Sequence, residues 1–184
     1  MRKIIITLVS ASFFSVFTCY ADDAQQIYNS MKNLEGDWTL ASADKQEGKA
    51  TKHKLVAPLV GTDAVGMNFK VIAKGSTVQE SLLPDTKKEM VSMYHCLDNA
   101  CSQVKATHYC VKQNQPEMIA DLSSTKNSLS YDCDMNTALC QSDQDHIHKI
   151  SHDVSNGGNH LKTTYTSWKD GKYLKDSVYH FDRK

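Results

Sequence analysis

The sequence predicts a mainly β domain whose antiparallel strands close into a single barrel behind a short N-terminal helix. From Trp38 onward, short runs of alternating apolar and polar residues follow one another, as half-buried strands do. Turn-forming pairs such as Asp98-Asn99 and Asp170-Gly171 separate these runs at intervals of roughly ten residues. A set of about eleven strands favours a closed barrel, because closure removes the exposed strand edges.

Each element follows from its local pattern. Ile27, Met31 and Leu34 recur at helical spacing, so residues 22–35 are predicted to form a helical segment. With three prolines and no low-complexity tract, we expect no linker, and residues 36–184 are predicted to form one barrel domain. The expected strands lie near residues 36–43, 50–58, 65–73, 76–83, 88–96, 101–111, 116–122, 127–133, 144–154, 159–168 and 173–182.

Residues 1–21 are predicted to be a cleaved secretory signal peptide. A basic start, Arg2 and Lys3, precedes an apolar stretch, and the small residue Ala21 comes before two acids. The apolar stretch is too short to favour a membrane-spanning helix. The mature chain is therefore expected to be periplasmic or secreted. The alternative is a lipid anchor on Cys19, whose preceding threonine fits a lipidation motif poorly.

The composition argues against several classes of partner. The chain has 21 basic and 21 acidic residues and no basic block or tail, so neither nucleic acid nor an anionic membrane surface is an expected partner. Apart from the leader, no apolar run is long enough to span a bilayer, so stable membrane insertion is not expected. Removal of the leader leaves 163 of the 184 residues, which suits one domain with a hydrophobic core. The composition indicates no particular oligomeric state.

Five cysteines follow the leader, and an exported protein meets oxidising conditions, so disulfides are expected. Cys96 and Cys101 flank a good turn, and Cys133 and Cys140 flank a slightly longer loop. The local pairs Cys96–Cys101 and Cys133–Cys140 are the simplest solution, although four cysteines allow three connectivities. Cys110 is left over and is predicted to be free or to act as a ligand.

The histidines suggest a metal site. Alternate residues of a strand share a face, so His108 lies beside Cys110, while His146, His148 and His152 share a face of another strand. Two histidines at positions i and i+2 of a strand can both reach one ion. His108 or Cys110 would then complete a zinc or copper site. The alternative is a solvated strand face with histidines scattered by chance, and the histidines that look ordinary are His53, His152, His160 and His180.

Cys110 is also a candidate nucleophile. A histidine base and the amides of Asn114 or Gln115 would give a Cys-His-Asn arrangement. However, neighbours two apart on a strand point in parallel, and the lead-in motif of a thiol protease is absent, so a buried structural thiol is favoured. Pro116 ends the strand, and the two amides either satisfy the loop backbone or anchor a ligand at the barrel mouth.

An ordered series of motifs extends through residues 34–183: GDW (36–38), KGSTVQE (74–80), EMVSMYH (89–95), THYC (107–110), NQPEM (114–118), HIH (146–148) and W-x-x-GK (168–172). This series resembles a family of uncharacterised bacterial proteins, many of them exported, that are expected to adopt a lipocalin-like (calycin-like) barrel. The resemblance implies that fold and a site location, but no reaction. The cysteines of the two predicted bridges are additions to the family pattern. The positions that the pattern retains, and that we expect to bind a ligand, are Glu80, Tyr94, His95, His108, Tyr109, Cys110, Asn114, Gln115, His146 and His148.

These features predict an exported, lipocalin-like barrel that binds a small apolar ligand in a His/Tyr/Cys-lined site. One alternative is a metal- or haem-binding barrel that uses His108, His146 and His148, because histidine and tyrosine are both haem-iron ligands. The sequence does not decide between a transition metal, haem and no cofactor. A second alternative is a small-molecule enzyme with a histidine general base, and a third is an envelope protein without a small-molecule site. A binding protein is favoured over an enzyme.

Overall fold

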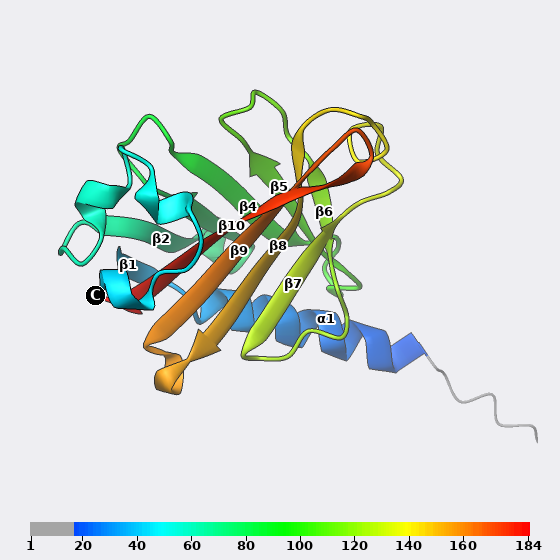
Figure 1. The fold of residues 1–184 in the computed structure, drawn as a ribbon. Helices are drawn as coiled ribbons and strands as arrows, with labels where there is room; N and C mark the ends of the chain where they lie inside the picture. The colour runs from blue at the N-terminus through cyan, green and yellow to red at the C-terminus, as the bar shows by residue number, and fades with distance from the viewer. Residues whose placement is uncertain (1–16) are drawn as a thin grey trace, which may run out of the picture.

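The computed structural model describes residues 17–184, with side chains from residue 23 onward. A single helix, α1 (Phe17–Lys32), precedes ten strands in this part of the chain (Figure 1). The strands are β1 (Gly36–Leu40), β2 (Val65–Ile72), β3 (Thr77–Leu82), β4 (Met90–Cys96), β5 (Val104–Tyr109), β6 (Glu117–Ala120), β7 (Ser128–Cys133), β8 (His146–Ser155), β9 (His160–Lys169) and β10 (Lys172–Arg183).

The ten strands form one closed antiparallel barrel. Each strand pairs with the next along the chain, and β1 also pairs with β10, so every strand has two neighbours. Trp38 of β1 lies opposite Arg183 on one side and Met67 on the other. The predicted fold class, a mainly β antiparallel barrel behind one helix, is confirmed at this level.

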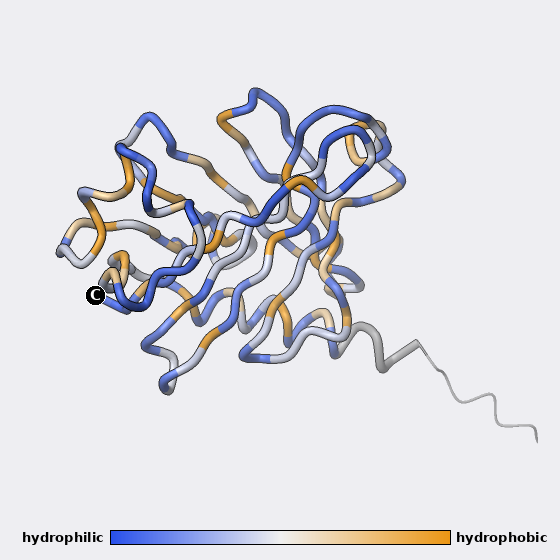
Figure 2. The backbone as a smooth tube through the Cα atoms, viewed as in Figure 1, coloured by the Kyte–Doolittle hydropathy of each residue, from blue (hydrophilic) through white to orange (hydrophobic). Residues whose placement is uncertain are grey.

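The barrel core follows the alternation in the sequence. Along β9, Leu161, Thr163, Tyr165 and Ser167 are buried, whereas the residues between them are partly exposed. Figure 2 shows hydrophobic and hydrophilic residues alternating along the strands. Burial of each large apolar side chain contributes roughly 1.5–3 kcal/mol, so this face stabilises the sheet in its observed register.

Helix α1 covers one end of the barrel (Figure 1). Ile27 and Met31 of α1 are buried in the same core as the strand residues. The Trp38 indole Nε1 donates a hydrogen bond to the Leu34 carbonyl at 2.9 Å, and the Arg183 guanidinium lies 4.2 Å from the centre of the Trp38 ring. These contacts connect the segment that follows α1, the first strand and the last strand, and they close this end of the barrel.

One predicted strand was wrong. Residues 50–58 form two 3-10 turns, Ala50–Lys52 and Ala57–Leu59, so the barrel has ten strands rather than about eleven. The reason is that β1 pairs directly with β2, which leaves no unpaired edge for this segment. Pro58 also lacks a backbone N–H with which to join a ladder.

Both predicted disulfides are present. Cys96 bonds to Cys101 with a Cα–Cα distance of 4.7 Å, and Cys133 bonds to Cys140 with a Cα–Cα distance of 5.7 Å. Cys110 is a free, buried cysteine, as the odd count predicted. The two bridges indicate an oxidising environment of the kind that exported proteins meet.

Helix α1 begins at Phe17 and ends at Lys32, so it is shifted toward the N-terminus relative to the predicted segment 22–35. Residues 1–16 of the predicted signal peptide lie outside the described residues, as does the side chain of Cys19. Within the described part of the chain, no helix has the length and apolar character needed to cross a membrane.

Gly66 of β2 is a sensitive point in the barrel wall, because a Cβ there would lie 2.9 Å from Leu40 Cγ and 3.2 Å from Phe181 Cε1. We expect Gly66→Ala to reduce the free energy of unfolding by about 1–3 kcal/mol through overpacking. Lys70→Ala, at an exposed position of the same strand, should change it by less than about 0.5 kcal/mol. Urea unfolding of both variants measures this, and equal stabilities would contradict the packing argument.

Candidate functional site

A buried carboxylate, Glu80, lies at the centre of the barrel. It occupies an inward position of β3 and is fully buried. Its Oε2 accepts a 2.5 Å hydrogen bond from the Tyr94 hydroxyl, and its Oε1 accepts one from the Tyr165 hydroxyl. His152 Nε2 lies 3.3 Å from Oε2. The three partners come from β4, β9 and β8, so this carboxylate connects both sides of the barrel.

Burial alone opposes the charged form of Glu80 and would raise its pKa. The hydrogen bond and the electrostatic attraction from His152, together with the hydrogen bonds from Tyr165 and Tyr94, outweigh burial, so the pKa of Glu80 is lowered below its usual range. The pKa values of Tyr94 and Tyr165 are raised well above the ordinary value by burial and by the adjacent carboxylate. Glu80 is therefore an ionised acceptor, and the two tyrosines remain protonated donors.

His152 joins this group from the opposite wall. Its Nδ1 lies 3.1 Å from the Thr163 hydroxyl, and its Nε2 lies 3.2 Å from the Tyr94 hydroxyl. Because Tyr94 donates its own proton to Glu80, the contact with Tyr94 requires a proton on His152 Nε2. The contact with the Thr163 hydroxyl satisfies Nδ1. A residue that looked ordinary in the sequence is thus a member of the buried core.

Ser92 and His108 extend the group toward the open end of the barrel. The Ser92 hydroxyl lies 3.5 Å from Glu80 Oε1 and 2.9 Å from His108 Nδ1. When Ser92 donates to the carboxylate, it accepts the proton of His108 Nδ1, so His108 Nε2 carries a lone pair. Nε2 is buried and has no hydrogen-bond partner among the described residues. Burial lowers the pKa of His108 to about 4, so the ring is neutral.

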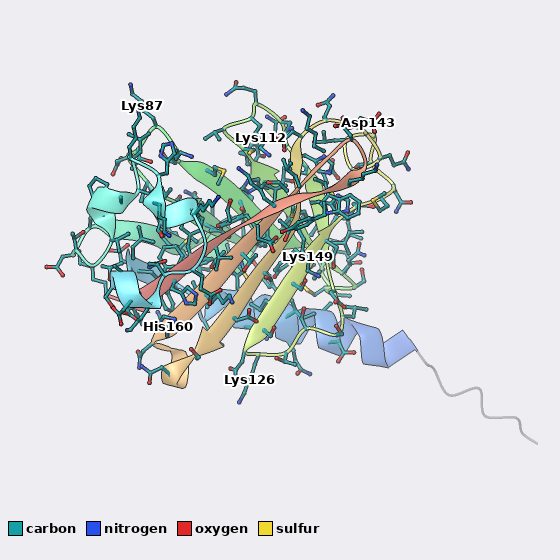
Figure 3. The ribbon with its side chains drawn as sticks, in the orientation of Figure 1. Lys87, Lys112, Lys126, Asp143, Lys149 and His160 are labelled. Atoms are coloured by element: carbon teal, nitrogen blue, oxygen red, sulfur yellow. A yellow bond between two sulfur atoms is a disulfide. The ribbon has the colours of Figure 1, made fainter. Side chains whose placement is uncertain are left out.

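A pocket of about 110 Å³ lies at the end of the barrel opposite α1, and we call it the mouth pocket. Its apolar wall includes Met90, Cys110, Ile147 and Tyr179. Three lysines also line it: Lys88, Lys112 and Lys175. Figure 3 shows Lys112 at this end, next to the loop that carries Lys87.

Cys110 lies against Met90, with 3.8 Å between the two sulfur atoms. Burial raises the pKa of the Cys110 thiol, so the protonated form is favoured and the sulfur is a weak nucleophile. No histidine contact with this sulfur is seen in the described part of the chain. The geometry therefore favours the buried structural thiol over the catalytic one.

The loop after β5 is tied to the start of β8. The Lys112 ammonium pairs with the Asp145 carboxylate and lies 3.4 Å from the Ser167 hydroxyl. The Asn114 side-chain amide donates to the Asp145 carbonyl at 2.9 Å. The NQP and HIH segments, which are far apart in the sequence, therefore meet beside the mouth pocket.

His146 and His148 lie at the start of β8, where the strand contains a β-bulge. The register shifts between Ile147 and Lys149, so His148 is the extra residue. The His148 ring stacks on Trp168 at 3.9 Å with an interplanar angle of 12°. The prediction that His146 and His148 share a face with His152 is wrong, because the bulge interrupts the alternation of the strand.

The predicted metal residues are only partly brought together. His146 Nε2 lies 3.0 Å from His148 Nδ1, whereas His108 instead contacts Ser92 in the barrel core. In the described part of the chain, the three-residue cluster of ligating side chains contains Cys133 in place of His108, with all ligand atoms within 4.8 Å of one another. Cys133 is in a disulfide, so its sulfur is not a thiolate ligand in this state.

The remaining predicted site residues do not converge on one point. Tyr109 is 48% exposed, Gln115 is exposed, and His95 Nδ1 lies 2.9 Å from the Cys96 carbonyl. The ten positions thus fall into four places. Glu80, Tyr94 and His108 lie in the buried core, Cys110 and Asn114 at the mouth, His146 and His148 at the bulge, and His95, Tyr109 and Gln115 outside these groups.

Sequence reasoning missed several members of the site. Tyr165 and Thr163 alternate with Leu161 along β9, so the parity of that strand marked them as inward. No local pattern indicated that His152 is buried. The bulge that separates it from His146 cannot be recognised in a sequence that alternates regularly. Of the lysines of the mouth pocket, Lys88 and Lys112 lie in two different loops and Lys175 lies in β10, so their convergence depends on barrel closure.

Haem does not fit the mouth pocket, because a volume of about 110 Å³ is below the 300–1,000 Å³ typical of cofactor sites. Larger crevices exist elsewhere. One of about 490 Å³ lies between Asn33 near the end of α1 and the β8–β9 turn at Gly157, and another of about 400 Å³ lies over β7 and β8. Their walls are mostly polar side chains and turn backbone, which is a poorer setting for a small organic ligand.

The fold and the site therefore define a closed β-barrel with a buried ionised core and a small cationic pocket at one end. No protein-family model, curated protein or solved structure matches the chain. The resemblance to the exported barrel family stays a prediction.

His108 makes stability depend on pH, because burial lowers its pKa in the folded state to about 4 while the unfolded chain titrates near 6.5. The unfolded state therefore binds a proton first, and stability falls as the pH drops below about 6.5. At about 1.4 kcal/mol per pH unit, we expect a loss of roughly 2–3 kcal/mol between pH 6.5 and 4.5.

The variant His108→Gln removes the histidine that titrates. The free energy of unfolding should therefore depend much less on pH between pH 6.5 and 4.5. His53→Gln, at a partly exposed histidine outside the barrel core, is the control and should change the slope far less than His108→Gln does. Urea unfolding at a series of pH values provides the measurement. Parallel profiles for the wild type and His108→Gln would show that His108 is not the group responsible.

Proposed function

We propose that this protein is an exported barrel that binds a small molecule with an apolar body and an anionic group in the mouth pocket. The observation that carries the proposal is the composition of that pocket: an apolar wall around Cys110, with Lys88, Lys112 and Lys175 beside it. Apolar walls with a few placed polar groups are typical of small-molecule sites.

The filled interior supports a small ligand. Large side chains, including Trp38, Tyr94, Tyr131, Tyr165 and Phe181, are fully buried and occupy the barrel. A volume of about 110 Å³ corresponds to the share of roughly four water molecules in the liquid. The pocket therefore suits a short chain or one end of a longer molecule.

The charge of the pocket supports an anionic group. Lys112 pairs with Asp145, but Lys88 and Lys175 have no carboxylate partner within 4.0 Å among the described residues. Two uncompensated ammonium groups at a pocket rim attract an anion. Each such exposed pair contributes about 0.2–1 kcal/mol, so charge favours an anion without dominating its affinity.

Hexanoate and its uncharged analogue hexanol test this proposal. We expect hexanoate to bind about five- to tenfold more tightly, since two lysine contacts add roughly 1 kcal/mol. Titration of ¹⁵N-labelled protein should shift the amide resonances of Cys110, Val111 and Ile147 and leave those of α1 unchanged. Shifts confined to the crevice beside Gly157, or no shifts at all, would contradict the proposal.

Two variants distinguish the contribution of the lysine charge to binding from that of the pocket's shape. Lys88→Met should lower hexanoate affinity by about two- to fivefold and leave hexanol affinity unchanged. Its neighbour Lys87 does not line the pocket, so Lys87→Met is the matched control and should leave both affinities unchanged. Ser177→Leu fills the pocket and should weaken both ligands. Equal effects of Lys88→Met and Lys87→Met would count against an anion site.

A further inference from the structure

We infer that reduction of the Cys133–Cys140 bridge converts the loop between β7 and β8 into a site for a divalent metal of the zinc type. The proposed ligands are the two cysteine sulfurs together with His146 and His148. This inference does not depend on the mouth pocket. It concerns the loop between β7 and β8 and the two histidines at the start of β8.

The four ligand atoms are already close to one another. Cys133 Sγ and one nitrogen of each histidine all lie within 4.8 Å of one another, and Cys140 Sγ is bonded to Cys133 Sγ. In sequence, the ligands lie along one short segment in the order C-x6-C-x5-H-x-H, with Cys133 at the end of β7, Cys140 within the loop and the two histidines at the start of β8. A short loop that brings four ligands together lowers the entropy cost of forming the site.

The nitrogen atoms also have a suitable proton arrangement. His146 Nδ1 lies 2.7 Å from the Gln144 carbonyl, so it carries the proton of the neutral ring. His146 Nε2 therefore presents a lone pair and accepts the proton of His148 Nδ1 at 3.0 Å. A metal bound between these two nitrogens takes the place of that proton, and the neutral His148 ring then carries its proton on Nε2. Donation of the second ring N–H to a backbone carbonyl is the usual support of a metal-binding histidine.

The second histidine is held in place by packing. The His148 ring stacks face to face on Trp168, and the bulge places His148 on the same side of the strand as His146. Both rings are therefore oriented before a metal arrives, and only the sulfur atoms must move. Zinc bonds of about 2.0–2.1 Å to nitrogen and about 2.3 Å to sulfur place the N and S atoms roughly 3.6 Å apart. Once the bridge is broken, rotation of the Cys133 side chain about its Cα–Cβ bond allows its sulfur to shift by about 1 Å toward the histidines. Rotation of the Cys140 side chain allows the two sulfurs to separate to roughly 3.8 Å, as two thiolates on one tetrahedral zinc require.

The chemistry requires a dithiol as reductant. The dithiol supplies two electrons and two protons, the Cys133–Cys140 S–S bond breaks, two thiols form, and the dithiol becomes a disulfide. Metal binding then displaces the two thiol protons and gives a tetrahedral site with two thiolates and two neutral imidazoles. In the oxidised protein the sulfurs are bonded to each other, and two histidines remain as the ligands.

Cobalt(II) is the probe for this site, because tetrahedral thiolate coordination gives it charge-transfer absorption and intense visible bands. The test uses the full mature chain with Cys96→Ser, Cys101→Ser and Cys110→Ser, which leaves Cys133 and Cys140 as its cysteines. After treatment with a dithiol and removal of the reductant without oxygen, we expect one equivalent of Co²⁺ to bind with the thiolate absorption. The oxidised form of the same protein should show no thiolate absorption.

Ligand variants decide the assignment. His148→Gln and Cys133→Ser should each lower Co²⁺ affinity at least about tenfold, since even outer-shell partners of a metal contribute that much. His53→Gln is the control and should have no effect. Thiolate absorption that survives His148→Gln unchanged, binding without that absorption, or loss of the near-ultraviolet circular dichroism on reduction would overturn the inference.

Discussion

The structure depends on one buried ionised carboxylate and the donors around it. An isolated carboxylate in the barrel interior would carry a large desolvation cost, which only hydrogen bonds and charge complementarity can offset. The Tyr94 and Tyr165 hydroxyls, the Ser92 hydroxyl and the His152 ring supply these contacts to Glu80. Since the donors come from three strands other than β3, the carboxylate specifies the register in which those strands meet.

This constraint determines where a ligand can bind. The centre of the barrel is occupied by the Glu80 contacts and by large side chains, and α1 with Trp38 and Arg183 closes one end. The opposite end keeps a small pocket, into which Cys110 projects. His108 lies two residues before Cys110 on the same inward face, so the buried polar core begins directly below the pocket.

The features that could be predicted from the sequence are those that depend on neighbouring residues, such as strand positions and the disulfide across a turn. Ten of the eleven strands predicted from the alternating runs overlap β1 to β10, and the Cys96–Cys101 bridge predicted across the Asp98-Asn99 turn is present. Prediction from the sequence failed where the outcome depends on distant partners. Residues 50–58 have strand-like residues but no free edge to join, and His152 finds its carboxylate partner on β3, more than seventy residues away. The regular alternation of the sequence does not reveal the bulge at His148. The pair His146 and His148 was therefore predicted, wrongly, to share a face with His152.

Measuring the ionisation state of Glu80 tests most directly whether the barrel is built around a buried, charged carboxylate. Carbon-13 NMR of protein labelled at the glutamate side-chain carboxyl, assigned with a Glu80→Gln variant, reports it without disturbing the barrel. We predict that the Glu80 carboxyl signal is that of a carboxylate at neutral pH and stays so below pH 4.5, the ordinary pKa at which exposed glutamates take up a proton. A Glu80 signal typical of the protonated acid at neutral pH would contradict it.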